Sequence, residues 1–279
     1  MYQPHSVFAT KKSIEEPIWR YMSFTKFLSL LYSKQLFFSS VSELQKNDPF
    51  EGRLAELNQS PEYRRDVMSE VFKHFEPEMA EMLIEQWYFE REKFIAQMAH
   101  FTVVNCWHIN RYESAAMWKL YLSGGEGVAI RSSFDRLKRC FLETSRTPVT
   151  SDGARVPIHI GEVRYIDHRN DIMDDSHTYR LFLYKYKAFE HERELRAMSV
   201  FLPLAFGFDS LDLETPNKEL PEILKKLKSS KGISFPIDLE TLIDEIVLAP
   251  NSPQWIAELA QTVISQTGLK LKIRPSELF

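Results

Sequence analysis

The sequence is poor in several features, and each shortage excludes a class of protein. Only 9 of its 279 residues are glycine, which argues against a glycine-lined nucleotide cradle. Cys106 and Cys140 are its only cysteines, so a disulfide framework is not implied and a reducing cytoplasm is the expected compartment. The net charge of −4 gives no global attraction to nucleic-acid phosphates. No apolar run approaches the roughly 18 residues of a membrane span, and the first residues lack the apolar centre of a signal peptide.

Apolar and aromatic residues are abundant by contrast. They make up 44% and 13% of the chain, and the 20 phenylalanines supply a sizeable core. Strand-like and helix-like segments alternate too irregularly for a doubly wound parallel sheet. We therefore expect an α+β protein in which residues 1–279 form a single domain.

The N-terminal part predicts a strand, a helix and a second strand in close succession. Residues 17–23 are strand-like, residues 24–34 carry apolar side chains at helical spacing, and "QLFFSSV" returns to a strand. The stretch "KNDPFEG" (Lys46 to Gly52) follows. Asn47, Asp48 and Pro49 are typical of a turn, because Asn and Asp bond their own backbone and Pro fixes φ. Phe50 would anchor the turn in the core, and Glu51 would shape a cleft by pairing with an arginine or touching a ligand.

Residues 61–98 read as a charged helical pair that interrupts the flow of strands, an insertion or cap within the domain. One apolar stripe precedes the break at Pro77 and continues after it. Its members before the break are Val67, Met68, Val71, Phe72 and Phe75, and those after it are Met79, Met82, Leu83, Trp87, Phe94, Ile95 and Met98. The pattern predicts two amphipathic helices.

The remaining chain predicts further strands and helices. A strand is expected over residues 100–108, a helix over residues 112–122 with Met117, Trp118 and Tyr121, and another strand over residues 127–134. The aromatic-rich tract from Ile172 to Phe189 reads as a helix. The C-terminus predicts a last strand, helix and strand, at "EIVLAP", residues 253–266 and "LKLKI".

The segment "ERELRAMSVFLP" alternates charged and apolar residues, which predicts a half-buried strand with Glu192, Glu194 and Arg196 on one face. Two neighbouring carboxylates repel each other, so a cation is expected beside them, either Arg196 or Lys187. Glu192 and Glu194 are the candidate catalytic carboxylates.

Several candidate residues have a structural and a functional interpretation. Trp118 and Tyr121 are either core residues or a stacking platform for a ligand. Arg20 is either a surface or ion-pair residue or an anchor for phosphate. Cys106 is followed closely by His108, but no third group orients them as a nucleophile and base would require. No HExxH, CxxC or EF-hand spacing occurs, so no metal is expected.

An ordered set of motifs resembles a bacterial family known only as a domain of unknown function. The motifs are "WRYMS", "LFFSSVSELQKNDPFEG", "NCWH", "ESAAMWKLYLSGGEGVAI", "VRYID" and "YKAFEHERELR". The resemblance covers about residues 18–196. It implies no function, because that family has no established one.

A second resemblance is to the ADP-ribosyltransferase superfamily, which has a split mixed sheet around NAD. Arg20, then Ser39 or Ser40, then Glu192 or Glu194 occur in the order of its Arg-Ser-Glu subclass. The resemblance implies that Arg20 and its neighbour Tyr21 belong to the NAD site. An arginine would hold the pyrophosphate, a serine the nicotinamide ribose, and a carboxylate the positive charge that develops as nicotinamide leaves. The serine strand departs from that pattern by lacking the usual Ser-Thr-Ser, and no aromatic clamp is evident.

Three functions follow from these residues. The first is a bacterial effector, toxin or defence protein that uses NAD to modify a protein or nucleic acid, or hydrolyses NAD. The second is a non-catalytic binding or regulatory module in which the signature residues, including Asn47, Asp48 and Glu51, hold the fold. The third is a metal-dependent nuclease built from Asp48, Glu51, Glu192 and Glu194, which the absence of a basic patch disfavours.

Overall fold

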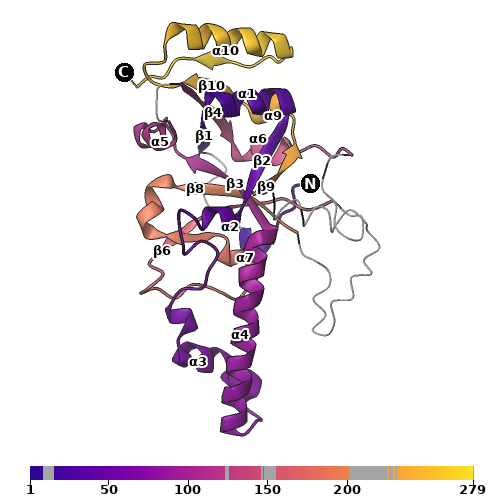
Figure 1. Cartoon of the computed structure of the whole chain (residues 1–279), viewed down its shortest axis with the longest axis vertical. Helices are drawn as coiled ribbons and strands as arrows, with labels where there is room; N and C mark the ends of the chain where they lie inside the picture. Colours follow the sequence, from indigo (N-terminus) through magenta and orange to yellow (C-terminus); the bar gives the residue numbers. More distant parts are fainter. Residues whose placement is uncertain are drawn as a thin grey trace.

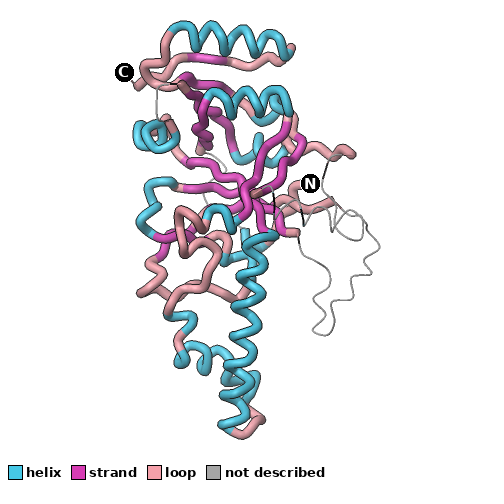
Figure 2. Tube along the Cα trace, viewed as in Figure 1, coloured by secondary structure: helices cyan, strands magenta, loops and turns pink. Residues whose placement is uncertain are grey.

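The computed structural model describes residues 1–8, 16–122, 126–145, 147, 155–201, 225, 229 and 231–278. In these residues the protein is a mixed α/β molecule with one large mixed β-sheet (Figure 2). The strands are β1 (Pro17–Ser23), β2 (Gln35–Ser40), β3 (Thr102–Ile109), β4 (Gly127–Ser133), β5 (His159–Glu162), β6 (Arg164–Ile166), β7 (Tyr184–Tyr186), β8 (Glu194–Val200), β9 (Gly232–Pro236), β10 (Glu245–Leu248) and β11 (Ile273–Arg274). Strands β6 and β7 form a separate parallel pair.

The α-helices are α1 (Phe24–Ser33), α2 (Val41–Leu44), α3 (Pro61–Phe72), α4 (Pro77–Phe101), α5 (Ala115–Tyr121), α6 (Phe134–Arg139), α7 (Thr178–Leu181), α9 (Leu239–Leu242) and α10 (Gln254–Thr267). Three short 3₁₀ helices are η1 (Ser6–Phe8), η2 (Leu57–Gln59) and η3 (Lys187–Glu192). Among the described helices, none has both the length and the apolar character that crossing a bilayer requires.

The predicted strand, helix and strand at the N-terminus are confirmed as β1, α1 and β2. Ser23 ends β1 and caps α1 by accepting a hydrogen bond from the backbone N–H of Lys26. Helix α1 ends at Lys34, whose left-handed backbone turns the chain into β2. The C-terminal strand, helix and strand are confirmed as β10, α10 and β11.

The large sheet is split between β1 and β2. Strand β3 pairs along one edge with β8, from Thr102 to His108. Its other edge is divided, because β2 pairs with it at Val103 and Val104 and β1 pairs with it at His108 and Ile109. Residues 105–107 of β3 pair with neither strand. The two halves of the sheet therefore diverge over the middle of β3.

Helices cover both faces of this sheet (Figure 1). One face packs against α1, α6, α9 and α10 and forms the main core, to which Phe27, Phe38 and Trp107 belong. The opposite face packs against α2 and α4 through Val41, Met98 and their neighbours. Because side chains alternate along a strand, Trp107 faces the main core whereas Cys106 and His108 face the opposite side.

Helices α3 and α4 form a hairpin that projects away from the sheet (Figure 1). They occupy the region of the predicted helical insertion, and α4 continues past its expected end to Phe101. The predicted apolar stripe is divided, because Met68 packs between the helices whereas Val71 and Met82 are exposed. The partners of Met68 on α4 are Ile84 and Tyr88, which the prediction did not include.

Two sequence predictions are wrong in the region before β8. Residues 172–189 do not form one helix but a loop, α7, β7 and the start of η3, because β7 pairs with β6 and the loop is bonded to α3 and its neighbours. The predicted strand at residues 192–203 begins only at Glu194, since Arg193 has a left-handed backbone. Strand β8 is buried along its whole length, not half-buried, because β3 and β5 flank it.

Candidate functional site

A pocket of about 590 Å³ opens at the split in the sheet. It is lined by both strands that diverge, by the unpaired middle of β3, and by residues of α1, η3 and β8. Its volume is within the range of small-molecule and cofactor sites. The pocket passes from the main-core face of the sheet, which carries Arg20, to the opposite face, which carries Glu194.

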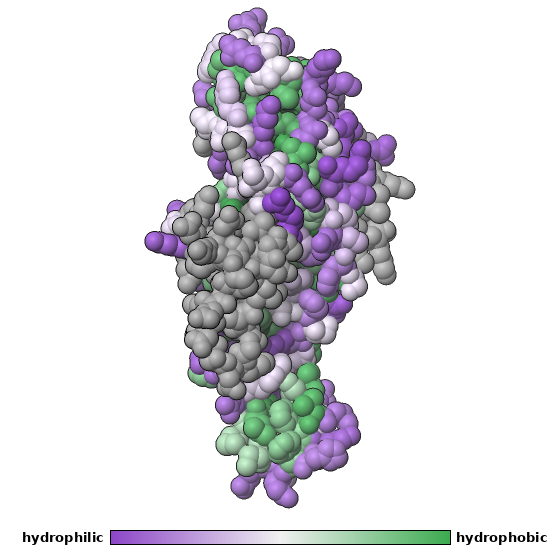
Figure 3. Space-filling model, turned by 90° about the vertical axis from the view of Figure 1, so that its right-hand side faces the viewer, coloured by the Kyte–Doolittle hydropathy of each residue, from purple (hydrophilic) through white to green (hydrophobic). Residues whose placement is uncertain are grey.

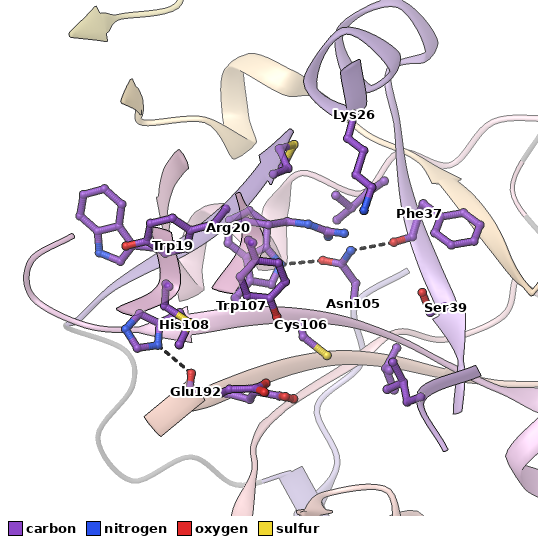
Figure 4. Close-up of a pocket in the computed structure, with 18 of the residues that line it drawn as sticks. Trp19, Arg20, Lys26, Phe37, Ser39, Asn105, Cys106, Trp107, His108 and Glu192 are labelled. Atoms are coloured by element: carbon purple, nitrogen blue, oxygen red, sulfur yellow. Dashed lines mark hydrogen bonds between the residues drawn. The ribbon is translucent and has the colours of Figure 1, made fainter. Parts of the chain in front are cut away.

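Arg20 enters the pocket from β1 (Figure 4). Its guanidinium carbon lies 6.0 Å from the centre of the Trp107 ring. The Nη1 atom of Arg20 is buried, and no described residue provides it with a hydrogen-bond partner or a carboxylate. Burial lowers the pKa of this guanidinium. A buried arginine without a counterion is costly, so this side chain is suited to bind an anionic or polar group of a ligand.

Lys26 and Asn105 extend the polar surface beside Arg20. Lys26 reaches into the pocket from α1 and forms no ion pair with a described residue (Figure 4). The amide of Asn105 donates to the carbonyl of Phe37 at 2.8 Å and accepts from the Trp107 indole at 2.7 Å. Asn105 therefore bridges the split to β2 and fixes the Trp107 ring against which Arg20 lies.

A chain of charged side chains forms the other end of the pocket. Lys185 donates to Glu192 at 2.7 Å and to Glu194 at 2.6 Å. Glu194 also accepts from the Nε atom of Arg196 at 2.7 Å, and Arg196 makes a two-pronged ion pair with Glu51. Both oxygens of Glu194 are thus occupied by cations, whereas Glu192 has one such contact.

The two carboxyl groups beside Lys185 titrate differently. Burial, together with the hydrogen bond and charge of Glu194, raises the pKa of Glu192 to about 7. Burial also opposes the ionisation of Glu194, but Arg196 and Lys185 overcome it and hold its pKa well below the usual range. The charges of Glu194 and Glu51 likewise raise the pKa of Arg196 despite its burial. Glu194 is thus a permanent anion, and Glu192 can exchange a proton near neutral pH.

The turn "KNDPFEG" holds Glu51, one member of this charged chain, in position. Asp48 accepts a hydrogen bond from the backbone N–H of Phe50 at 3.0 Å, and the Phe50 ring stacks on His168. Gly52 has a φ of +66°, and a Cβ atom there would meet the Phe182 ring. The turn thereby places Glu51 against Arg196. Asn47 is exposed at the pocket wall.

His108 and Cys106 face the acidic end of the pocket. The Nδ1 atom of His108 lies 2.7 Å from the backbone carbonyl of Glu192, which only accepts, so Nδ1 carries the proton. The Nε2 atom is then an acceptor, and it is buried with no described partner. Burial lowers the pKa of His108. Burial and Glu194 raise the pKa of the Cys106 thiol, so it is not an activated nucleophile.

Most of the residues predicted to be catalytic, cofactor-binding or cleft-shaping line this one pocket. Those that do are Arg20, Tyr21, Ser39, Asn47, Asp48, Glu51, Tyr121, Glu192 and Glu194. Three others lie outside its lining. Ser40 is buried with its hydroxyl 3.0 Å from that of Ser42, Trp118 packs in the core below Tyr21, and Arg196 lies behind the wall. Tyr121 is exposed at the pocket, whereas Tyr21 accepts a hydrogen bond from the backbone of Ser114.

The prediction that Arg196 or Lys187 lies beside the two carboxylates is confirmed only for Arg196. Arg196 does contact Glu194, but Lys187 pairs with Asp167 at 2.7 Å instead. Glu192 lies in η3 and does not share a strand face with Glu194. Lys185, Lys26, Asn105 and the acceptor role of His108 were missed. One feature of the sequence could have identified Lys185. It lies two residues before Lys187, so on a strand it would face the same side as the lysine that was considered.

Within the described part of the chain, no group of three or more His, Cys, Asp or Glu residues is arranged to hold a metal ion. Lysine and arginine nitrogens contact Glu51, Glu192 and Glu194 where a metal-dependent nuclease would need metal.

Comparisons of the chain with protein-family models, curated proteins and solved structures find no match.

Proposed function

We propose that this protein binds NAD in the pocket at the split of the sheet and breaks its nicotinamide–ribose bond. One observation carries the proposal. The unpaired guanidinium of Arg20 and the titratable carboxyl of Glu192 line the same pocket, with Ser39 on the strand across the split. This is the arrangement that the resemblance to ADP-ribosyltransferases implies.

The two ends of the pocket have opposite electrostatic character, and NAD has matching ends. Arg20 and Lys26 are the cations without described counterions, and they suit the pyrophosphate. The acidic end holds three carboxylates, Glu51, Glu192 and Glu194, against two cations. When Glu192 is ionised, this end has an excess negative charge, which suits the positively charged nicotinamide ring. Ser39, which lines the pocket between these ends, would hold a ribose hydroxyl.

Glu192 is the proposed catalytic carboxylate, and Glu194 a positioning residue. As the bond between ribose C1′ and the nicotinamide nitrogen breaks, its electron pair goes to the nitrogen and positive charge develops at C1′. The Glu192 carboxylate would stabilise this charge. It would then accept the proton of the acceptor nucleophile, water or a group on a protein or nucleic acid, as that nucleophile bonds to C1′.

A non-catalytic binding module is the second candidate, and the buried ion pairs favour it. Glu51, Arg196 and Glu194 are almost completely inaccessible and hold three segments of the fold together. In this interpretation the signature motif around Glu51 is structural, and the pocket binds a ligand without turnover. Arg20 would still require an anionic ligand.

The test measures NAD binding by calorimetry and nicotinamide release by chromatography. We expect wild-type protein to bind NAD and release nicotinamide, and Glu192→Gln to bind NAD while losing at least about 100-fold in turnover, the scale of general acid–base catalysis. Glu190→Gln is the matched control, because Glu190 is exposed in the same 3₁₀ helix and does not line the pocket. Binding without release in wild type supports the binding module, and absence of NAD binding contradicts the proposed NAD activity. Labelled NAD incubated with candidate proteins and RNA distinguishes transfer from hydrolysis.

A further inference from the structure

The end of the α3–α4 hairpin carries a cluster of exposed apolar side chains. Figure 3 shows it as the green surface at the lower end of the molecule. We call it the hairpin patch, and its members are Val67, Val71, Phe75, Met79, Met82 and Phe89, with exposed fractions between 47% and 62%. Isolated exposed apolar residues are normal, but a contiguous patch of this kind marks an interaction site.

Helix α4 is apolar on two faces, and only one of them is covered by described residues. Ile84 and Tyr88 face α3 and pack on Met68. Met79 and Met82 lie on another side of the helix and are exposed. A helix that needs only one contact with its own domain would carry polar residues on its outer face. The second apolar face is therefore suited to a second contact.

The hairpin patch belongs to a preformed surface. Arg91 and Tyr63 both bond to Asp175, at 2.8 and 2.7 Å, and fix the base of the hairpin to the loop before α7. Arg64 links the two helices by ion pairs with Glu85 and Glu92. A partner would meet this surface without the entropic cost of ordering it.

The charges around the patch are unbalanced. Every lysine and arginine of the hairpin is already in an ion pair, and these residues are Arg64, Arg65, Lys73, Arg91 and Lys93. Asp66, Glu76 and Glu78 form no ion pair with a described residue. Glu76 and Glu78 lie at the tip of the hairpin, where α3 connects to α4, and Asp66 precedes Val67 on α3. The surface is thus apolar in its centre and negative at its edge.

We propose that the hairpin patch is a docking site for a basic amphipathic helix of a partner protein. The apolar face of such a helix would lie on Val71 and Met82, and its lysines or arginines would pair with Glu76 and Glu78. The negative edge disfavours an anionic membrane. It also disfavours a second copy of this chain, because a two-fold contact would bring the same unpaired carboxylates together. The proposal is independent of the NAD site.

The test uses fluorescent synthetic 18-residue peptides as probes and the full chain as receptor. One peptide has leucine at helical spacing with lysine elsewhere, a second has the same composition in scrambled order, and a third has glutamate in place of lysine. We expect fluorescence anisotropy to show saturable binding of the first peptide only. The double substitution Val71→Ser with Met82→Ser should weaken it at least 10-fold, and Glu76→Lys with Glu78→Lys should also weaken it.

The control variant is Trp255→Ser with Leu259→Ser, which removes two exposed apolar side chains from α10 and should leave binding unchanged. Equal binding of the scrambled or glutamate peptide overturns the proposal, and so does binding that the patch variant does not change. Sedimentation of the wild-type and patch-variant chains provides a further check. A dimer lost in the patch variant would assign the patch to self-association instead, and binding of the wild type to anionic vesicles would assign it to a membrane.

Discussion

Glu192 and Glu194 lie two residues apart and share the ammonium group of Lys185, yet their carboxyl pKa values shift in opposite directions. The difference follows from Arg196, which contacts Glu194 but not Glu192. One acid is fixed as an anion, and its charge helps to keep a proton on the other. Pairs of carboxyl groups separated in this way are typical of acid–base sites.

The two acids should therefore differ in their effect on stability. Glu194→Gln leaves Arg196 short of one buried partner, and we expect a loss of about 3–5 kcal/mol in the free energy of unfolding. Glu192→Gln removes a buried charge that burial disfavours, while its amide oxygen still accepts from Lys185, so we expect no loss at pH 8. Urea unfolding measures both variants, with Glu190→Gln as control. Equal losses in the two variants would contradict the distinct roles.

Stability and activity should both change with pH through Glu192. Its folded-state pKa, about 7, is above its ordinary value of 4.5, so the folded state binds this proton more tightly than the unfolded state does. Ionisation of Glu192 then reduces stability as pH rises from 4.5 to about 7, and Glu192→Gln should abolish that part of the dependence. Glu194 acts oppositely, since its lowered pKa gives stability at neutral pH that is lost on acidification.

The proposed turnover needs the Glu192 carboxylate, so the nicotinamide release rate at saturating NAD should rise with pH and level off above about pH 7. Rates measured from pH 5 to 9 check this, with circular dichroism confirming that the protein stays folded. An inflection near pH 4.5 would mean that Glu192 is not the titrating group.

Local patterns in the sequence identified part of this site. The apolar spacing in residues 24–34 was enough to place β1, α1 and β2, because a capped amphipathic helix between two short strands depends on neighbouring residues. Arg20 and Ser39 were then correctly assigned to two strands that one helix connects. The order of Arg20, Ser39 and Glu192 along the chain does not by itself predict that they lie close together. That prediction came from the resemblance to ADP-ribosyltransferases.

The features of the site that the sequence did not predict depend on contacts between distant segments of the chain. The split in the sheet arises because β1 and β2 both pair with β3, which follows them by more than 60 residues of chain. Lys185 was missed because its aromatic neighbours have helical spacing, whereas pairing with β6 makes the segment a strand. Glu192 was assigned to a strand because nothing local predicted the left-handed backbone of Arg193.

Arg20 should lower the stability of the protein while enabling it to bind its ligand. Arg20→Met preserves the length of the side chain and removes a buried charge that has no described counterion. We expect the free energy of unfolding to rise by about 1 kcal/mol or more. NAD binding should weaken at least 10-fold, because a charge-assisted contact is lost. Denaturation and calorimetry measure the two effects, with Arg139→Met, which affects an exposed arginine on α6, as control. A destabilised Arg20→Met protein would indicate a structural role.

His108 should recognise a hydrogen-bond donor of the ligand through Nε2 and position Glu192 through Nδ1. His108→Asn keeps an amide donor for the Glu192 carbonyl but lacks an acceptor at the Nε2 position, whereas His108→Gln supplies an acceptor there without the Nδ1 donor. We expect His108→Asn to weaken NAD binding about 10-fold with turnover largely kept, since an unpaired ligand donor costs on the order of 1–3 kcal/mol. His108→Gln should bind NAD but turn it over slowly, because Glu192 is no longer held.

Nitrogen NMR of the wild-type imidazole tests the same assignment without any ligand. The hydrogen bond to the Glu192 carbonyl requires the tautomer with the proton on Nδ1, so the Nε2 resonance should have the shift of an unprotonated ring nitrogen at pH 7. A proton on Nε2 would exclude the acceptor role whatever the pocket binds. If the Nδ1 proton is confirmed but both variants bind NAD as tightly as wild type, His108 only supports η3. The hydrogen-bond donor of the ligand would then have to bond to another acceptor of the pocket.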